Sequence, residues 1–265
     1  MYKLVALDID GTLLNTKWEI TRKTKEAIKQ ASAKGTHIVV SSARPYRSLI
    51  GIAEQLELGE VPVIAAGGSD LRMYPSGEVL HRVALGKRDI KRCIEFCHRH
   101  KQYFQVFRFD GSYYFEKETE FSKIYESRFY KGEEADFENW EWEDCSSFMV
   151  TMKDEDIDDI TLAAEKEMLR EYLIVKIWYN MLEFHPKNGG KGAALTTLAA
   201  RLNIDKADII AVGDDTIDIP MLRSAGLAVA MGNACDALKE VADYIAPTND
   251  EDGVAEIIKR FVLNT

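Results

Sequence analysis

The sequence predicts an α/β fold in which a doubly wound parallel sheet is interrupted by an inserted α+β domain. Two observations favour this fold. Short apolar runs alternate with helical stretches up to about Ala66 and again after Lys191, the pattern of β-α units around a parallel sheet. Between these parts the pattern changes to a hairpin and mixed segments. We therefore expect a core domain built from residues 1–83 and 186–265 and an insert over residues 84–185.

The first part of the core is expected to hold strands at the runs that begin at Leu4 and His37 and at the run that ends at Ala66. Helices are predicted over Arg22–Lys34 and Tyr46–Leu58. Each helical stretch is followed by a glycine, the residue type that most often closes a helix in the left-handed conformation.

The insert begins with a predicted β-hairpin, because Asp110-Gly111 separates two aromatic strands. Its further elements, and those of the second part of the core, follow from hydrophobic periodicity. The hairpin strands are expected at 103–109 and 112–115, strands at 147–152 and 173–179 with a helix at 156–169 between them, then a helix at 193–202 and strands at 209–212, 228–231 and 244–246. The aromatic density of the insert leaves substrate contact as an alternative, but we expect most of the hairpin's aromatic residues to pack against a sheet face: Phe104, Phe107, Tyr113 and Phe115.

The four cysteines form no framework typical of a secreted protein, so reduced thiols are expected. Cys93 and Cys97 precede His98 and His100, which raises the alternative of a zinc site. However, Ile90, Cys93, Ile94 and Cys97 follow the spacing of one helix face, and the spacing matches no standard zinc finger. A helix face turned toward a core is therefore favoured.

Charge and hydropathy narrow the range of partners. The formal net charge of −10 argues against binding to nucleic acid or to an anionic membrane, because neither attracts an acidic surface. No apolar run approaches the ~20 residues of a membrane span, and the first strand begins without a charged leader. These features predict a cytoplasmic globular protein, and they do not indicate its oligomeric state.

Acidic residues follow two of the predicted strands. Asp8 and Asp10 close the first apolar run, and Asp214 and Asp215 close the run that ends at Gly213. The carboxyl ends of parallel strands meet at one edge of a sheet, where such folds bind ligands. Clustered carboxylates repel one another unless a cation joins them, and hard oxygen ligands suit Mg²⁺. For an isolated Asp-x-Asp-Gly, an ordinary acidic turn remains an equal alternative.

Two further motifs could bind an anion. Ser42 follows the apolar run that begins at His37, shortly before a predicted helix, and hydroxyls and helix-terminal N–H groups bind phosphate oxygens. Lys191 lies in the glycine-rich segment Asn188-Gly189-Gly190-Lys191-Gly192 before a helix. Taken alone, Ser42 fits a turn residue and Lys191 a solvated surface lysine.

Taken together and in order, these motifs resemble the four motifs of the haloacid dehalogenase superfamily. They are Asp8-Ile9-Asp10-Gly11-Thr12, Ser42 with Arg44, Lys191, and Gly213-Asp214-Asp215 with Asp218. The position of the insert resembles the Cof-type sugar-phosphatase group, which has a large mixed α/β cap. Met231-Gly232-Asn233-Ala234 and Asn249-Asp250-Glu251-Asp252-Gly253-Val254 are similar to stretches near the carboxyl end of that group.

The resemblance implies a Mg²⁺-dependent phosphatase that acts on small phosphorylated metabolites through an aspartyl-phosphate. Asp8 would be the nucleophile and Asp10 the general acid and base, the two roles that such a two-step hydrolysis requires. The residues implied to bind the phosphate are Gly11, Thr12, Ser42, Ala43, Arg44 and Lys191. Those implied at the metal site are Asp8, Asp10 through its carbonyl, Asp214, and, further from the ion, Asp215 and Asp218. For Asp215, a solvated carboxylate at a helix start is the alternative.

The chain departs from the family pattern at three positions. The family usually has glycine at Ala43 and asparagine at Gly67 and Ile217, so two polar side chains are missing near the expected site. Because of these departures, a protein that binds its ligand but has weakened catalysis remains an alternative. A phosphomutase that uses the same nucleophile is another alternative. A phospho-acceptor signalling domain is a further alternative, but such domains are small and single, and the insert together with Asp10 favours turnover.

Overall fold

The computed structural model describes residues 2–128, 130–142, 144–177 and 180–264. The chain divides into two compact units, one formed by residues 1–82 and 190–265 and the other by residues 83–189. No helix among the described residues combines the length and the apolar character needed to cross a membrane.

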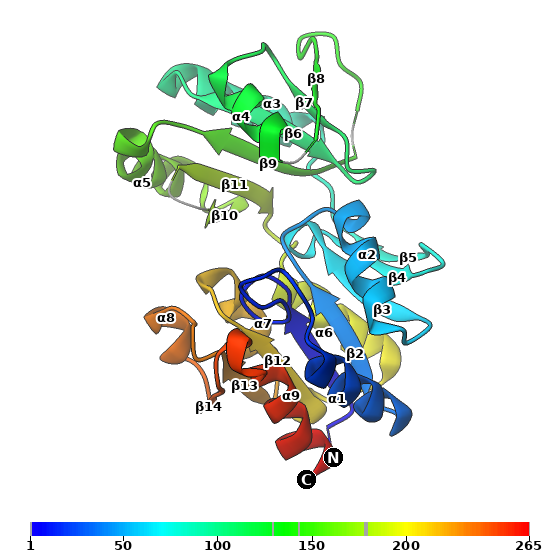
Figure 1. The fold of residues 1–265 in the computed structure, drawn as a ribbon. Coiled ribbons are helices and arrows are strands. Elements are labelled where there is room, and N and C mark those ends of the chain that lie inside the picture. Colours follow the sequence, from blue (N-terminus) through cyan, green and yellow to red (C-terminus); the bar gives the residue numbers. More distant parts are fainter. Residues whose placement is uncertain (1, 129, 143, 178–179, 265) are drawn as a thin grey trace. The chain divides into compact units, whose positions relative to one another are not determined.

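The first unit is built on an eight-stranded sheet with the order β14-β13-β12-β1-β2-β3-β4-β5 (Figure 1). The strands from β14 to β3 are parallel, and β4 and β5 continue the sheet antiparallel. The strands are β1 (Leu4–Asp8), β2 (His37–Ser41), β3 (Val61–Ala65), β4 (Asp70–Tyr74), β5 (Val79–Arg82), β12 (Ile209–Gly213), β13 (Leu227–Ala230) and β14 (Tyr244–Ile245).

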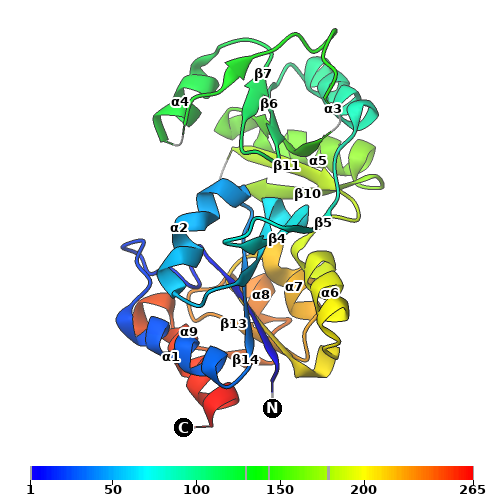
Figure 2. The same cartoon turned by 90° about the vertical axis from the view of Figure 1, so that its right-hand side faces the viewer.

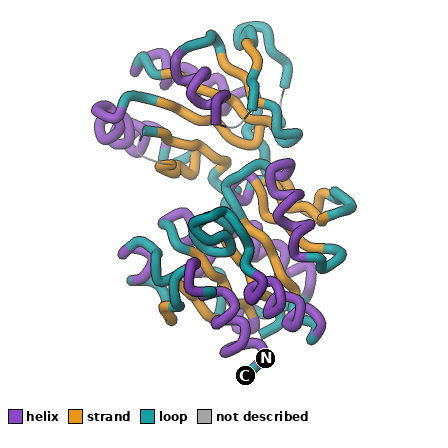
Figure 3. The backbone as a smooth tube through the Cα atoms, viewed as in Figure 1, coloured by secondary structure: helices purple, strands orange, loops and turns teal. Residues whose placement is uncertain are grey.

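Helices cover both faces of this sheet, as Figures 2 and 3 show. The central strands are buried over their length because alternate residues enter two cores: Val5 and Leu7 pack with α1, α2 and α9, whereas Leu4 and Ala6 pack with α6, α7 and α8. The helices are α1 (Arg22–Ala33), α2 (Tyr46–Leu56), α6 (Lys191–Leu202), α7 (Ile219–Arg223), α8 (Asp236–Lys239) and α9 (Gly253–Ile257), which continues as a π-helical turn over Ile258–Leu263. The predicted doubly wound α/β fold is confirmed.

Two local features differ from the sequence prediction. The helix expected to run to Leu58 ends at Leu56, because Glu57 adopts the left-handed conformation (φ 54°) and closes it before Gly59. The hairpin of β4 and β5 was not predicted. It follows a short 3-10 turn over Ala66–Gly68 and extends the parallel sheet with antiparallel strands.

The second unit contains a six-stranded sheet with the order β10-β11-β9-β6-β7-β8. Its neighbours pair antiparallel, except for β7 and β8. The strands are β6 (Tyr103–Arg108), β7 (Tyr113–Phe115), β8 (Glu133–Glu134), β9 (Cys145–Thr151), β10 (Tyr172–Ile177) and β11 (Met181–Pro186), and the helices are α3 (Lys87–His100), α4 (Glu120–Arg128) and α5 (Ile157–Met168). The predicted hairpin is confirmed as β6 and β7.

The core of this unit lies between the sheet and helices α3 and α5. Cys93 and Cys97 are buried in that core, on the face of α3 predicted from their spacing. The four aromatic residues of the hairpin are also buried, Phe104 in the α3 core and the other three in a second aromatic cluster. The strand predicted to run to Tyr179 is described as far as Ile177, and its last two residues lie outside the described residues.

The second unit extends past residue 185, the predicted end of the insert. Strand β11 pairs with β9 as far as Phe184 and with β10 as far as Pro186. The N–H of Gly189 then donates to the carbonyl of Pro186. The chain re-enters the first unit at Gly190, directly before α6.

Candidate active site

The site lies at the carboxyl end of the parallel sheet of the first unit. Strands β1 and β12 pair in parallel, with Leu7 opposite Val212, so Asp8 and the loop that begins at Asp214 emerge side by side. Strand β2 lies on the other side of β1 and places Ser41 opposite Asp8. Three separate parts of the sequence therefore deliver polar groups to one edge of the sheet, as the alternation of strands and helices predicts.

Lys191 connects two of the carboxylates. Its ammonium donates to Oδ1 of Asp8 at 2.5 Å and to Oδ1 of Asp218 at 2.7 Å. The side chain of Lys191 is 1% exposed, and both carboxylates are buried. A buried lysine requires such partners, because desolvation strongly disfavours an isolated charge. The solvated surface lysine that the sequence alone allowed is therefore not what the structure shows.

The buried charges do not balance. Burial and the carboxylate of Asp218 raise the pKa of Asp8 well above its usual range. Burial and Asp218 likewise raise the pKa of Asp214, to about 6. Burial disfavours the ammonium of Lys191, but the carboxylates of Asp218 and Asp8 outweigh it and keep its pKa above the ordinary value. One ammonium thus faces three carboxylates, and the site is short of positive charge.

A divalent cation would supply the missing charge. One carboxylate oxygen each from Asp8, Asp214 and Asp218 can be chosen so that all three lie within 4.8 Å of one another. Hard oxygen donors of this kind suit Mg²⁺ or a similar ion, and a bound cation would stabilise the anionic form of the raised-pKa carboxyls. The residues present therefore fit a metal site.

The three carboxylates are not equivalent. Oδ2 of Asp218 accepts the N–H groups of Asp214 and Asp215 at 3.1 and 3.3 Å, while its Oδ1 binds Lys191. With both oxygens engaged, Asp218 holds the lysine and the loop in place. Asp8 and Asp214 are left as the better candidates for direct metal ligands.

The turn after β1 brings the backbone onto Asp214. Gly11 has φ +80°, and a Cβ at this position would lie 2.2 Å from Oδ2 of Asp214, so only glycine fits. The hydroxyl of the next residue, Thr12, donates to Oδ1 of Asp214 at 3.0 Å. Both residues were predicted to contact phosphate, and in the structure both lie against the carboxylate of Asp214.

Asp10 is engaged by Arg44. Nε of Arg44 donates to Oδ2 of Asp10 at 2.9 Å, and a terminal nitrogen donates to Oδ1 at 2.5 Å. This bidentate pair is only half-buried, with 41% of the Asp10 side chain and 35% of the Arg44 side chain exposed. The Asp10 carboxylate is outside the group that could hold a metal. The sequence resemblance had assigned Arg44 to the phosphate, but it did not foresee a contact with Asp10.

The remaining predicted residues lie around this centre in different roles. Ser42 is buried just after β2, and its Oγ accepts the backbone N–H of Arg44 at 3.1 Å. Ala43 is half-buried between them. Asp215 is exposed, and its carboxylate accepts the N–H of Thr216 at 2.6 Å, the helix-start arrangement kept open as its alternative.

Two asparagines hold the loop after β1 in place, and the sequence assigned no role to them. Nδ2 of Asn233 donates to the carbonyl of Gly11 at 2.8 Å, and its Oδ1 accepts the N–H of Asn249 at 3.0 Å. Nδ2 of Asn249 in turn donates to the carbonyl of Leu14 at 2.8 Å. Both belong to the carboxyl-terminal stretches quoted above for their family resemblance, which was the available signal.

Two of the three departures from the family pattern, Gly67 and Ile217, lie close to the centre. Gly67 is left-handed, with φ 63°, and its N–H donates to the carbonyl of Ser42 at 3.1 Å. Ile217 is half-buried in the 3-10 turn Thr216–Asp218. Gly67 thus forms this left-handed turn without the side chain that the family usually has there.

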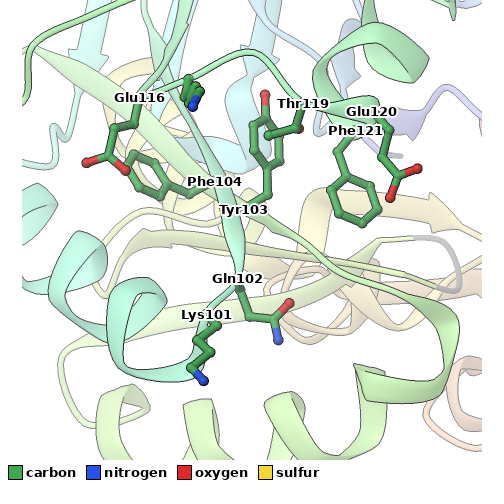
Figure 4. A pocket seen from close by; sticks show the side chains of 9 residues that line it. Lys101, Gln102, Tyr103, Phe104, Glu116, Thr119, Glu120 and Phe121 are labelled. Atoms are coloured by element: carbon green, nitrogen blue, oxygen red, sulfur yellow. The ribbon is translucent and has the colours of Figure 1, made fainter.

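A hollow of about 540 Å³ lies in the second unit, at the start of β6 and the loop before α4 (Figure 4). Its lining combines aromatic residues with two lysines and two glutamates: Lys101, Gln102, Tyr103, Phe104, Glu116, Lys117, Thr119, Glu120 and Phe121. None of these residues belongs to the four motifs, so the carboxylate cluster remains the candidate active site.

Comparison with known proteins agrees with this geometry. The haloacid dehalogenase-like hydrolase family matches residues 5–258. The chain is 31% identical to 5-amino-6-(5-phospho-D-ribitylamino)uracil phosphatase YcsE of Bacillus subtilis, covering 98% of this chain and 96% of the relative. It is 29% identical to phosphatase YwpJ of the same organism, covering 98% and 100%.

Solved structures give the same result. A haloacid dehalogenase-like hydrolase from Bacteroides thetaiotaomicron superposes with a TM-score of 0.84 at 26% identity, over 98% of this chain and 99% of the other. The family match extends over almost the whole sequence, and the structural likeness includes both units. The chain therefore belongs to the haloacid dehalogenase-like hydrolase family and is a phosphoric monoester hydrolase of the Cof type.

Proposed function

We propose that the protein hydrolyses small phosphomonoesters with the help of Mg²⁺, through a covalent aspartyl-phosphate on Asp8. The observation that carries this proposal is the buried Lys191, which binds Asp8 at 2.5 Å beside the carboxylate of Asp214. A phosphate dianion can approach this acidic cluster only where positive charge offsets the carboxylates. Lys191 provides part of that charge, and bound Mg²⁺ would polarise the phosphoryl group and neutralise the rest.

The two reaction steps divide between two carboxylates. Asp8 attacks phosphorus and the bond from phosphorus to the ester oxygen breaks. Asp10, which must be protonated and can therefore no longer accept both hydrogen bonds from Arg44 at this step, gives the departing alcohol its proton. Water then attacks the aspartyl-phosphate while Asp10 takes the proton, and the bond between Asp8 and phosphorus breaks to release phosphate. Ser42 and Lys191 are assigned to the phosphoryl oxygens. Asp8, the carbonyl of Asp10 and Asp214 are assigned to the metal.

Sugar phosphates and related metabolites are the proposed substrates. The YcsE relative is named for a phosphorylated ribitylamino-uracil, so that compound belongs first in a substrate screen. We assign the second unit, residues 83–189, to the role of a cap that selects substrates. A phosphomutase would use the same nucleophile. Release of free phosphate, measured together with any isomerised sugar phosphate, distinguishes the two activities.

The direct test of the proposal is Asp8→Asn. This nearly isosteric change should abolish the phosphoenzyme and turnover while the fold is kept, because it removes the nucleophile and one excess buried charge. The measurements are acid-quenched mass spectrometry of the protein, phosphate release and thermal unfolding. Asp158→Asn is the matched control, since that side chain is 93% exposed in the second unit. A phosphoenzyme at the wild-type level in Asp8→Asn would disprove the assignment.

Metal removal should stop turnover. Protein treated with a chelator should lose phosphate release and regain it with Mg²⁺, because the ammonium of Lys191 alone does not balance the three carboxylates. Asp214→Asn should raise the Mg²⁺ concentration for half-maximal rate by roughly tenfold or more, as loss of support at metal sites usually does. Wild-type activity that persists in chelator would exclude the metal role.

Asp10→Asn should slow turnover by about 10²–10⁴, the usual contribution of general acid–base catalysis. The rate of phosphoenzyme formation should fall strongly with alkyl phosphates. It should fall little with activated aryl phosphates, because their leaving groups need no proton. Rapid-quench kinetics with one substrate of each kind measures this difference. An equal loss with both kinds would show that Asp10 does not act as the acid.

A further inference from the structure

Trp18 is an unusual residue in the loop that follows β1, drawn in dark blue in Figure 1. Of the large hydrophobic side chains that are exposed among the described residues, Trp18 alone is aromatic. Its exposed fraction is 66%. Its backbone has φ 63°, a conformation that bulky residues rarely adopt. Residues in such sparsely populated conformations cluster at functional sites.

The surrounding turn fixes this conformation. The N–H of Trp18 donates to the carbonyl of Asn15 at 2.9 Å. Oδ1 of Asn15 accepts the N–H groups of Lys17 and Glu19 at 3.0 and 2.9 Å. The N–H of Thr16 donates to Asp250 at 2.9 Å, which ties the loop to the carboxyl-terminal segment. The indole is therefore presented from an ordered loop.

Trp18 lies beside the proposed acid. The guanidinium of Arg44 is 5.4 Å from the centre of the indole ring, within the range of a cation–π contact. The same guanidinium binds both oxygens of Asp10. Trp18 is thus one side chain away from Asp10, and much of its ring remains open to a ligand.

We propose that Trp18 is a specificity-determining residue that stacks on a planar heterocyclic ring carried by the alcohol part of the substrate. This inference rests on the proposed function, in which Asp10 protonates the departing alcohol. The alcohol must then leave on the Asp10 side of the phosphorus, which is the side where Trp18 lies. Stacking on an indole tolerates different rings, because each planar base offers a π-face.

The test compares two phosphomonoesters that share the same alcohol chain. Flavin mononucleotide and ribitol 5-phosphate both carry the phosphate on a ribityl chain, but only the first has a planar ring. Trp18→Ala should raise KM for flavin mononucleotide roughly tenfold, within the range of aromatic stacking on bases, and leave KM for ribitol 5-phosphate nearly unchanged. Trp18→Phe should recover most of the loss. Leu162→Ala, at a side chain that is also 66% exposed, is the matched control.

Calorimetric binding of both compounds to the Asp8→Asn protein separates this inference from the proposed function. A ring-dependent affinity that is lost in Asp8→Asn/Trp18→Ala supports the role of Trp18, even if the wild-type protein hydrolyses neither compound. Equal losses with both compounds would show that Trp18 acts only through Arg44 and Asp10. That result would overturn the inference. Equal affinity of the Asp8→Asn protein for both compounds, or no binding of either compound, would also overturn it. Thermal unfolding checks that each variant is folded.

Discussion

The buried contacts of Lys191 with Asp8 and Asp218 are the interaction on which the site depends. They join a lysine at the start of α6 to the end of β1 and to the turn after β12. Without the ammonium, these carboxylates and Asp214 would lie together in a buried region with no compensating charge, at a high cost in stability. The arrangement leaves a deficit of positive charge that a divalent cation would fill, and only then could an anionic phosphate ester approach the carboxylates.

Close backbone approach makes this contact possible. A Cβ on Gly68 would lie 2.0 Å from the carbonyl carbon of Gly190, so the turn after β3 touches the chain directly before Lys191. Gly68 has φ +105° and Gly190 has φ 146°, conformations that favour glycine. Gly68 and Gly190 therefore allow the close backbone packing before α6 that brings the ammonium of Lys191 to the carboxyl end of the sheet.

The strands and their acidic ends were predictable because each is a local pattern: an apolar run that ends in Asp8 or Asp214. The resemblance to a known family placed Lys191 in the same site as a residue that binds phosphate, but it did not predict the contacts of its ammonium with Asp8 and Asp218. The pairing of Arg44 with Asp10 was not predictable, because an arginine can reach several anions and only the packed loops decide between them. The same holds for Asn233, whose hydrogen bonds join segments far apart in the sequence.

The most direct test of this account is a double-mutant cycle on Lys191 and Asp8, measured by denaturant unfolding in metal-free buffer. Lys191→Met alone should destabilise the protein by about 3–5 kcal/mol, because it leaves Asp8 and Asp218 buried without a cation. Asp8→Asn alone should change stability little, and the double variant should be more stable than Lys191→Met by about 1 kcal/mol or more. Additive effects of the two substitutions would contradict the claim that Lys191 compensates the charge of Asp8.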